Sequence, residues 1–269
     1  MIIAALRAIS KNKFGLGKRL KQYAEIYLDL YHDYDYDFDK NGESVVVARL
    51  ARFAPKTVFV VGANVGEWSL VAAAAFPQAC VHAFELSAET RATLRRNLSG
   101  ARHVVADCAL GRSNGSVRYK DYGHQAKINT LISTSYHDAS TPYTEQTAAL
   151  MTGDQYMQDH GISQIDFLKI DVEGAEFQVL EGFQDALKNH RIRVIQFEYG
   201  YANGDAGHLM KHFHELLSDA DYEIGKIWTA GVLFAPFDHT MNNFDVGPNY
   251  LAVARTEPEI IQALRSPAP

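Results

Sequence analysis

From Thr57 onward, short apolar runs alternate with helix-length segments, and this order restricts the fold more than any other feature of the chain. The runs include TVFVVG, CVHAFE, IDFLKID and IRVIQFE, and segments such as EWSLVAAAAF and SAETRATLRRNL lie between them. Strands that alternate with helices form βαβ units on a parallel sheet. The nearly continuous apolar character of VFVV and DFLKI is typical of strands covered on both faces. The sequence therefore predicts an α/β fold with a mostly parallel sheet.

The last part of this region departs from the alternation. No helix-length segment separates YEIGKIW from NYLAVAR, so we expect an antiparallel pair that closes the sheet edge. A long insert between DCALG and IDFLKID contains the strand-like pieces SVRYKDYG and YTEQTAAL, and such inserts commonly recognise substrate. The predicted division is a helical N-terminal arm at residues 1–54, a core domain at 55–256 and a C-terminal tail at 257–269.

Composition narrows the classes of function. The chain has 269 residues, 47% of them hydrophobic, and a net charge of -6, so it can fill a core but would repel the phosphates of nucleic acid. Its two cysteines, Cys80 and Cys108, lack C-x-x-C spacing, which favours a reducing, cytoplasmic setting. No segment offers the roughly 18 uncharged apolar residues of a membrane span. We expect the basic, amphipathic start MIIAALRAISKNKFGLGKRL to pack as an arm, with contact to a membrane surface or a partner as the alternative.

The residues that end the predicted strands are the candidates for a ligand site, because the crevice of an open α/β sheet lies beyond the carboxyl ends of its strands. The first strand ends in small residues, 62–66, which lead into a helix whose free N–H groups can meet a ligand. The other strand ends are acidic: Glu85, Asp107, Asp171 and Glu198. The negative charges of these four acids would repel a diphosphate from the crevice.

These acids discriminate between cofactors. A nicotinamide dinucleotide carries two phosphate charges and favours G-x-G-x-x-G, whereas this turn reads G-A-N-V-G, with Asn64 in place of a second glycine. S-adenosyl-L-methionine has no phosphate, and its sulfonium, ammonium and ribose hydroxyl groups suit carboxylates. We therefore predict S-adenosyl-L-methionine as the cofactor, with a nicotinamide-dependent oxidoreductase as the alternative.

The segments VGANVGEWS, AFELSAETRATLRRNL, IDFLKIDVEGAE and IQFEYG together resemble the FkbM family of S-adenosylmethionine-dependent methyltransferases, over roughly Asn41 to Arg255. The resemblance implies a Rossmann-like class I methyltransferase fold, with a seven-stranded sheet whose last strand is antiparallel. It also implies O-methylation of a hydroxyl on a sugar, glycan or secondary metabolite. The cofactor-binding residues that it implies are Gly62, Ala63, Asn64, Gly66, Trp68, Glu85, Leu86, Asp107, Cys108 and Asp171. Among them, Glu85 would hold the ribose and Asp107 the adenine amino group.

Methyl transfer to a hydroxyl is an in-line displacement, so the enzyme chiefly aligns the oxygen and relieves it of its proton. The candidate catalytic residues are Asp171, Glu173 and Glu198, since IDVEG places the first two in the turn after a central strand. The further candidates are Glu176 and, from the insert, His124 and His137. Helix capping is the alternative role of Asp171, and complementing a helix dipole is that of Glu176.

One departure from the family pattern concerns Val60, which stands where the family usually has an acid two places before the first glycine. It motivates a third hypothesis, a non-catalytic relative that scaffolds glycan assembly. No metal site is predicted: DFDKNG lacks the glutamate that ends a calcium loop, and the His208 and His212 pair lacks the glutamate of H-E-x-x-H. A divalent ion at Asp171, Glu173 and Glu198 is left unassigned, as are the acceptor and the oligomeric state.

Overall fold

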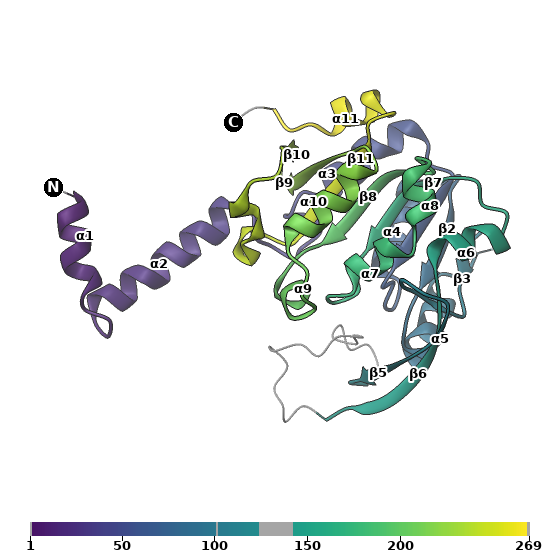
Figure 1. Cartoon of the computed structure of the whole chain (residues 1–269), viewed down its shortest axis with the longest axis horizontal. Coiled ribbons are helices and arrows are strands. Elements are labelled where there is room, and N and C mark those ends of the chain that lie inside the picture. Colours follow the sequence, from purple (N-terminus) through teal and green to yellow (C-terminus); the bar gives the residue numbers. More distant parts are fainter. Residues whose placement is uncertain (1, 101, 124–141, 268–269) are drawn as a thin grey trace.

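The computed structural model of the chain describes residues 2–100, 102–123 and 142–267, and within them an eight-stranded sheet forms the centre of the molecule (Figure 1). Its strands are β1 (Thr57–Val61), β2 (Cys80–Phe84), β3 (Val104–Val105), β7 (Ile165–Ile170), β8 (Ile192–Glu198), β9 (Tyr222–Trp228), β10 (Gly231–Phe234) and β11 (Asn249–Ala254). The order is β10-β9-β11-β8-β7-β1-β2-β3. The run from β3 to β8 pairs in parallel, and β11 is antiparallel to both of its neighbours. The mostly parallel sheet with an antiparallel last strand is therefore confirmed.

The sheet differs from the seven-stranded prediction at one edge. YEIGKIW and NYLAVAR pair antiparallel as predicted, but β11 inserts between β8 and β9 instead of closing the edge. The edge strand is β10, which forms an antiparallel hairpin with β9. Its four residues, GVLF, are too few to show the alternating pattern of a strand in the sequence. In the structure they hydrogen-bond to the edge of β9, whose backbone groups would otherwise be exposed.

Helices cover both faces of the sheet, as the continuous apolar strands predicted. Phe59 and Val61 of β1 belong to one apolar cluster, and Val58 and Val60 belong to the other. The first cluster includes residues of α6 (Gly153–Asp159), α7 (Glu176–Glu181), α8 (Gln184–Lys188) and α10 (Met210–Asp219). The second includes residues of α3 (Glu43–Leu50), α4 (Glu67–Ala75), α5 (Ala88–Asn97) and α11 (Pro258–Leu264). A further short helix, α9 (Tyr201–Asp205), follows β8.

The insert forms a small sheet of its own. It consists of β4 (Ala109–Leu110), β5 (Gly115–Asp121) and β6 (Thr144–Met151), in the order β4-β6-β5. The two longer strands pair antiparallel and contain most of the strand-like pieces that the sequence indicated. Residues 124–141, between these two strands in the sequence, lie outside the described residues.

The N-terminal helices α1 (Ile2–Ser10) and α2 (Leu16–Tyr31) extend away from the rest of the molecule (Figure 1). Neither helix has a buried residue, so the expectation that they pack on the core is wrong. Two other helices, by contrast, pack on the sheet beyond the predicted domain boundaries: α3, within the predicted arm, and α11, within the predicted tail. The boundaries at 54 and 256 remain predictions. Among the described helices, none has both the length and the hydropathy to cross a membrane.

Candidate active site

The turn after β1 is held in place by backbone contacts. Gly62 has a φ of +83°, and a Cβ added there would lie 1.7 Å from the carbonyl oxygen of Asp171, so no larger residue fits. The amides of Gly62 and Ala63 both donate to the carbonyl of Phe84, at 3.0 and 2.9 Å. The end of β2 and the turn after β7 thus fix the path of this loop between them.

Glu85 ties the next residue of the turn to the end of β2. Its Oε2 accepts the amide of Asn64 at 2.8 Å, and its Oε1 accepts the amide of Ser87 at 2.9 Å. Asn64 itself has a φ of +46°, a conformation that asparagine tolerates better than most residues. Burial raises the pKa of Glu85 above its ordinary value. The amide of Leu86 is a third backbone donor to this carboxylate, which leaves one of its four lone-pair sites for a hydrogen bond from a ligand.

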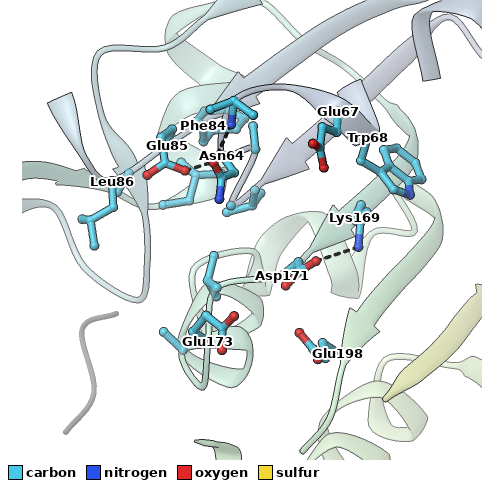
Figure 2. A pocket seen from close by; sticks show the side chains of 18 of the residues that line it. Asn64, Glu67, Trp68, Phe84, Glu85, Leu86, Lys169, Asp171, Glu173 and Glu198 are labelled. Atoms are coloured by element: carbon cyan, nitrogen blue, oxygen red, sulfur yellow. Dashed lines mark hydrogen bonds and ion pairs between the residues drawn. The ribbon is translucent and has the colours of Figure 1, made fainter. Parts of the chain in front are cut away.

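These residues line a cavity of about 390 Å³ beyond the carboxyl ends of the central strands (Figure 2). The predicted site residues that it brings together are Gly62, Ala63, Asn64, Trp68, Glu85, Leu86, Asp171, Glu173 and Glu198. Figure 2 shows Asn64 and Glu85 on one side of it, and Asp171, Glu173 and Glu198 on the other. The cavity therefore has a glycine-loop end and a carboxylate end.

Three predicted residues are not part of the lining. Gly66 begins α4, where its φ is +98° and an added Cβ would lie 2.8 Å from Leu94 Cδ1. The side chain of Asp107 is 86% exposed, and its ion pair with Arg95 lowers the pKa of the carboxyl group. Cys108 is buried in an apolar cluster, and this burial raises the pKa of its thiol. Cofactor binding by these three residues stays a prediction.

The carboxylate end begins with Asp171, the first residue after β7. Its amide donates to the carbonyl of Val61 at 2.9 Å, which keeps it beside the glycine loop. Its Oδ2 accepts a hydrogen bond from Lys169 Nζ at 3.0 Å. Both side chains leave the strand on the same face, because residues two apart in a strand point the same way.

Glu176 shapes the turn that carries Asp171 and Glu173. Its buried carboxylate accepts the amides of Val172 at 2.8 Å and Gly174 at 3.0 Å, and the amide group of Asn203 also donates to it. Burial raises the pKa of Glu176 to about 7. Because its oxygens face the turn and it is not among the residues that line the cavity, Glu176 supports the candidate catalytic residues from behind.

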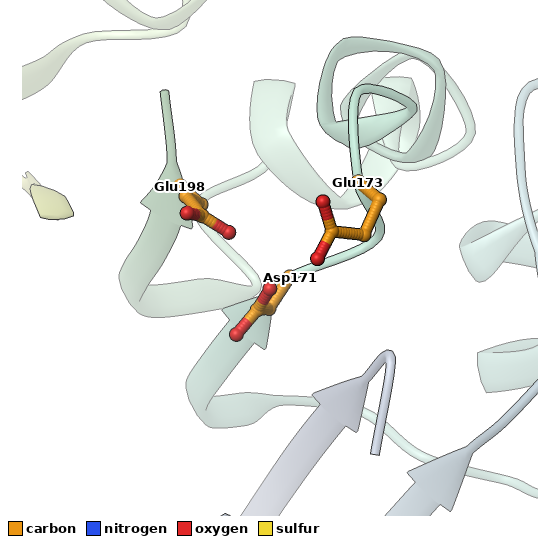
Figure 3. A group of neighbouring side chains, drawn as sticks. All are labelled: Asp171, Glu173 and Glu198. Atoms are coloured by element: carbon orange, nitrogen blue, oxygen red, sulfur yellow. The ribbon is translucent and has the colours of Figure 1, made fainter. Parts of the chain in front are cut away.

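Three carboxyl groups converge at this end of the cavity (Figure 3). One oxygen from each of Asp171, Glu173 and Glu198 lies within 4.8 Å of the others. Burial, followed by the charge of Asp171, raises the pKa of Glu198 well above its ordinary value, and a hydrogen bond joins the two side chains. Such a group can hold a proton between two carboxyls or bind a divalent cation.

A buried ion network lies behind Asp171. Burial alone would lower the pKa of Lys169, but the charges of Asp171 and Glu43 outweigh it and raise that pKa. Lys169 Nζ lies 3.6 Å from Glu43 Oε1 and 5.6 Å from the centre of the Trp68 ring. Glu43 also accepts from Trp68 Nε1 at 3.1 Å and from Gln196 Nε2. The first residue of α3 thus helps to position the carboxylate that ends β7.

Sequence reasoning missed several residues that line the cavity, among them Tyr36, Glu43 and Lys169. Lys169 could have been found, because it lies two residues before Asp171 in a predicted strand. Tyr36 and Glu43 belong to the predicted arm, and no local signal links them to the sheet. The proposed insert bases His124 and His137 lie outside the described residues.

The lining of the cavity is strongly acidic. Among the described residues it has six carboxylate side chains and one ammonium group, that of Lys169. The carboxylates belong to Glu43, Glu67, Glu85, Asp171, Glu173 and Glu198. This charge favours a cationic ligand over a phosphorylated one.

A family model described as the methyltransferase FkbM domain matches residues 61–224, which contain the glycine turn, Glu85 and the DVEG turn. The chain belongs to the FkbM methyltransferase family. The resemblance that the motifs carried is thereby confirmed, together with the class I methyltransferase fold of the parallel sheet, here extended by β10. Methyltransferase is accordingly the class of enzyme that the comparison supports.

Individual relatives are similar at low identity. The 31-O-demethyl-FK506 methyltransferase FkbM of Streptomyces tacrolimicus is 32% identical over 57% of this chain and 68% of its own. The hexuronic acid methyltransferase AglP of Haloferax volcanii is 24% identical over 70% of this chain and 78% of its own. The chain spans from 60% to 78% of the length of four curated relatives.

Among solved structures, the methyltransferase FkbM of Methylobacillus flagellatus KT matches with a TM-score of 0.46 and 18% identity. The match covers 74% of this chain and 43% of that one. A likeness of this degree adds no argument about ligands or activity.

Proposed function

We propose that the protein is an S-adenosylmethionine-dependent O-methyltransferase that acts on a hydroxyl of a sugar, glycan or secondary metabolite. The observation that carries the proposal is the acid-lined cavity beyond the glycine turn, with one lysine against six carboxylates among its described residues. A phosphate-free, cationic cofactor suits this charge, whereas a dinucleotide does not. Together with the family match, this argues against the nicotinamide alternative.

The residues at the glycine-loop end fit this cofactor. Backbone of Gly62 and Ala63 and the side chain of Asn64 would hold its methionine part, and Glu85 would accept a hydrogen bond from one of its ribose hydroxyls. When bound, the cofactor supplies a methyl group on a sulfonium cation. The tightly held loop would then present this group to the carboxylate end without rearrangement.

At the carboxylate end, Asp171 orients the acceptor hydroxyl and takes its proton. Lys169 fixes the Asp171 carboxylate through the contact at 3.0 Å, and Glu198 shares a hydrogen bond with the same carboxylate. Glu173 faces this pair from the turn (Figure 3). The chemistry therefore rests on positioning and on a proton acceptor that is already aligned.

Glu43 makes up for the acid that the family pattern has at position 60. Val60 pairs with Lys169 in the register of β1 and β7, so the two side chains point to the same face of the sheet. Val60 is buried among apolar residues, while Glu43 brings a carboxylate to Lys169 from α3. Because Glu43 supplies a carboxylate that position 60 lacks, we favour an active enzyme over a non-catalytic scaffold.

The acceptor group would be a neutral hydroxyl. A reacting group that is itself anionic would meet Asp171, Glu173 and Glu198 together, and like charges at close range repel, although the acceptor molecule can carry a charge elsewhere. Two relatives are named for action on 31-O-demethyl-FK506 and on hexuronic acid, which suits an acceptor from the secondary-metabolite or sugar classes. Cys80 and Cys108 are both free thiols, in line with the proposed cytoplasmic setting.

The test is transfer of a radiolabelled methyl group from S-adenosylmethionine to a panel of neutral sugars, uronic acids and macrolides. The proposal expects incorporation into at least one hydroxylated acceptor and its loss in Asp171→Asn. Binding of S-adenosylhomocysteine without transfer to any acceptor would favour the scaffold hypothesis. Hydride exchange with a nicotinamide cofactor would favour the oxidoreductase.

A further inference from the structure

The outer part of the predicted N-terminal arm, residues 2–31, is called the arm from here on, and it presents an apolar surface that the rest of the described chain leaves exposed. Ile2 is 77% exposed, Phe14 94% and Leu30 74%, and no residue of α1 or α2 is buried. A monomeric protein rarely leaves so many large apolar side chains together in water, and such surfaces mark interaction sites. This surface is therefore a candidate binding site for something other than the described body of the chain.

Five large apolar side chains of α2 lie on one face of the helix, with Ile26 and Leu28 to either side of it. They recur at spacings of three and four residues, and the positions are Leu16, Leu20, Tyr23, Tyr27 and Leu30. Lys18, Lys21 and Glu25 lie on the opposite face, where Lys21 and Glu25 form an ion pair. Tyrosine on the apolar face is typical of the boundary between lipid headgroups and hydrocarbon.

The charge of the arm identifies the occupant. Residues 1–24 contain six basic side chains, Arg7, Lys11, Lys13, Lys18, Arg19 and Lys21, and the first acidic residue is Glu25. The whole chain, in contrast, has a net charge of -6. Two copies of this arm would repel each other where the cations cluster, whereas an anionic bilayer would attract both.

We propose that the N-terminal arm docks on an anionic lipid bilayer, with α1 and the apolar face of α2 buried in the headgroup region. Each helix lies in the plane of the surface, since neither is long and apolar enough to cross it. The segment 11–15 between them contributes Lys11 and Lys13 to the phosphates and Phe14 to the interface. This inference goes beyond the proposed methyl transfer and does not depend on it.

The far end of the arm is fixed to the body, so docking would tether the whole enzyme. Lys226 Nζ donates to the carbonyl of His32 at 2.8 Å, and the amide of Thr229 donates to Asp33 Oδ2 at 3.0 Å. Trp228 packs against both Tyr31 and His32. These contacts connect the end of the arm to β9 of the sheet.

The experiment is flotation of the full chain with vesicles of phosphatidylcholine, either pure or with about a third of phosphatidylserine. We expect at least about tenfold tighter binding to the anionic vesicles, weakened by salt. Lys11→Glu, Lys13→Glu and Arg19→Glu together should lower that binding by about tenfold or more. The matched control is Arg52→Glu, Lys56→Glu and Lys188→Glu, which changes the net charge equally on the exposed body and should leave binding within about twofold.

A second variant tests the apolar face. Phe14→Ser with Leu20→Ser and Tyr27→Ser should also abolish binding to anionic vesicles, and it should fold because none of these side chains is buried. Equal binding of the charge-reversed arm and its control would overturn the proposal. The proposal would also be overturned if the natural chain failed to float with anionic vesicles. That holds whether light scattering shows a monomer or a dimer formed through the arm.

Discussion

The two ends of the cavity are held by different forces. At the glycine-loop end, backbone amides meet the carbonyl of Phe84, and Glu85 secures Asn64. At the carboxylate end, side-chain charges set the geometry: Lys169 lies between Asp171 and Glu43. The first end depends on the absence of a side chain and the second on a balance of charge. Substitutions should therefore damage the two ends in different ways.

The largest effect is expected at Gly62. Gly62→Ala places a methyl group against the Asp171 carbonyl at 1.7 Å, so the turn after β1 and the turn after β7 cannot both keep their positions. We expect loss of the cooperative unfolding transition in urea. The control is Gly161→Ala, since Gly161 has a φ of +63° with nothing near its Cβ position, and it should cost only about 1–2 kcal/mol. Equal stability of the two variants would show that the close approach is unimportant.

Asp171→Asn should have the next largest effect, on activity rather than on folding. An amide keeps the shape of the side chain but accepts no proton, so kcat/KM for methyl transfer should fall by about 10² to 10⁴. Asp159→Asn, on the exposed end of α6, serves as the control and should leave the rate unchanged. An Asp171→Asn enzyme with more than about a tenth of the normal rate would remove Asp171 from its proposed role.

Two buried lysines test the charge balance at the carboxylate end. Lys169→Met leaves Glu43 and Asp171 without their shared cation, which should cost about 3–5 kcal/mol of unfolding free energy. Lys226 is also buried, but burial lowers its pKa to about 8, and its hydrogen bonds go to backbone carbonyls. Lys226→Met should cost clearly less, as measured by urea unfolding at neutral pH. The reverse order would mean that the network around Lys169 is not what holds this end together.

The smallest effect is a pH dependence from Glu176. Its pKa is raised to about 7 in the folded protein from an ordinary 4.5, so between these values the folded state keeps a proton that the unfolded state has lost. Stability from this group is therefore present below about pH 4.5 and is lost as the pH rises through 7, by up to about 3 kcal/mol. Urea unfolding at a series of pH values should show this slope in the natural chain and a flatter one in Glu176→Gln. Parallel curves would assign the slope to other groups.

Sequence could predict the glycine-loop end well because its signals are local. The apolar run of β1, the small residues after it and the acid that ends β2 all lie within one βαβ unit, and the strand-end rule places them together. The same rule correctly placed Asp107 after β3. It could not predict the direction of the Asp107 side chain, which points outward and pairs with Arg95.

The carboxylate end was predicted only in part. Asp171, Glu173 and Glu198 follow from strand ends, and the structure brings them together. Glu43 and Tyr36 reach the cavity because a segment far away in the chain packs against the sheet. The periodicity of a sequence reveals local structure and does not predict such a tertiary contact. The arm shows the opposite failure: its amphipathic pattern was predicted correctly, but no residue of α1 or α2 is buried against the described part of the body.

The central claim is that carboxylates around the cavity select a cationic nucleoside without phosphate. Isothermal titration of the purified chain with S-adenosylmethionine, and separately with the reduced nicotinamide dinucleotide, tests it most directly. The account predicts a saturable heat with S-adenosylmethionine and none with the dinucleotide. Saturable binding of the dinucleotide, with no heat from S-adenosylmethionine, would contradict it.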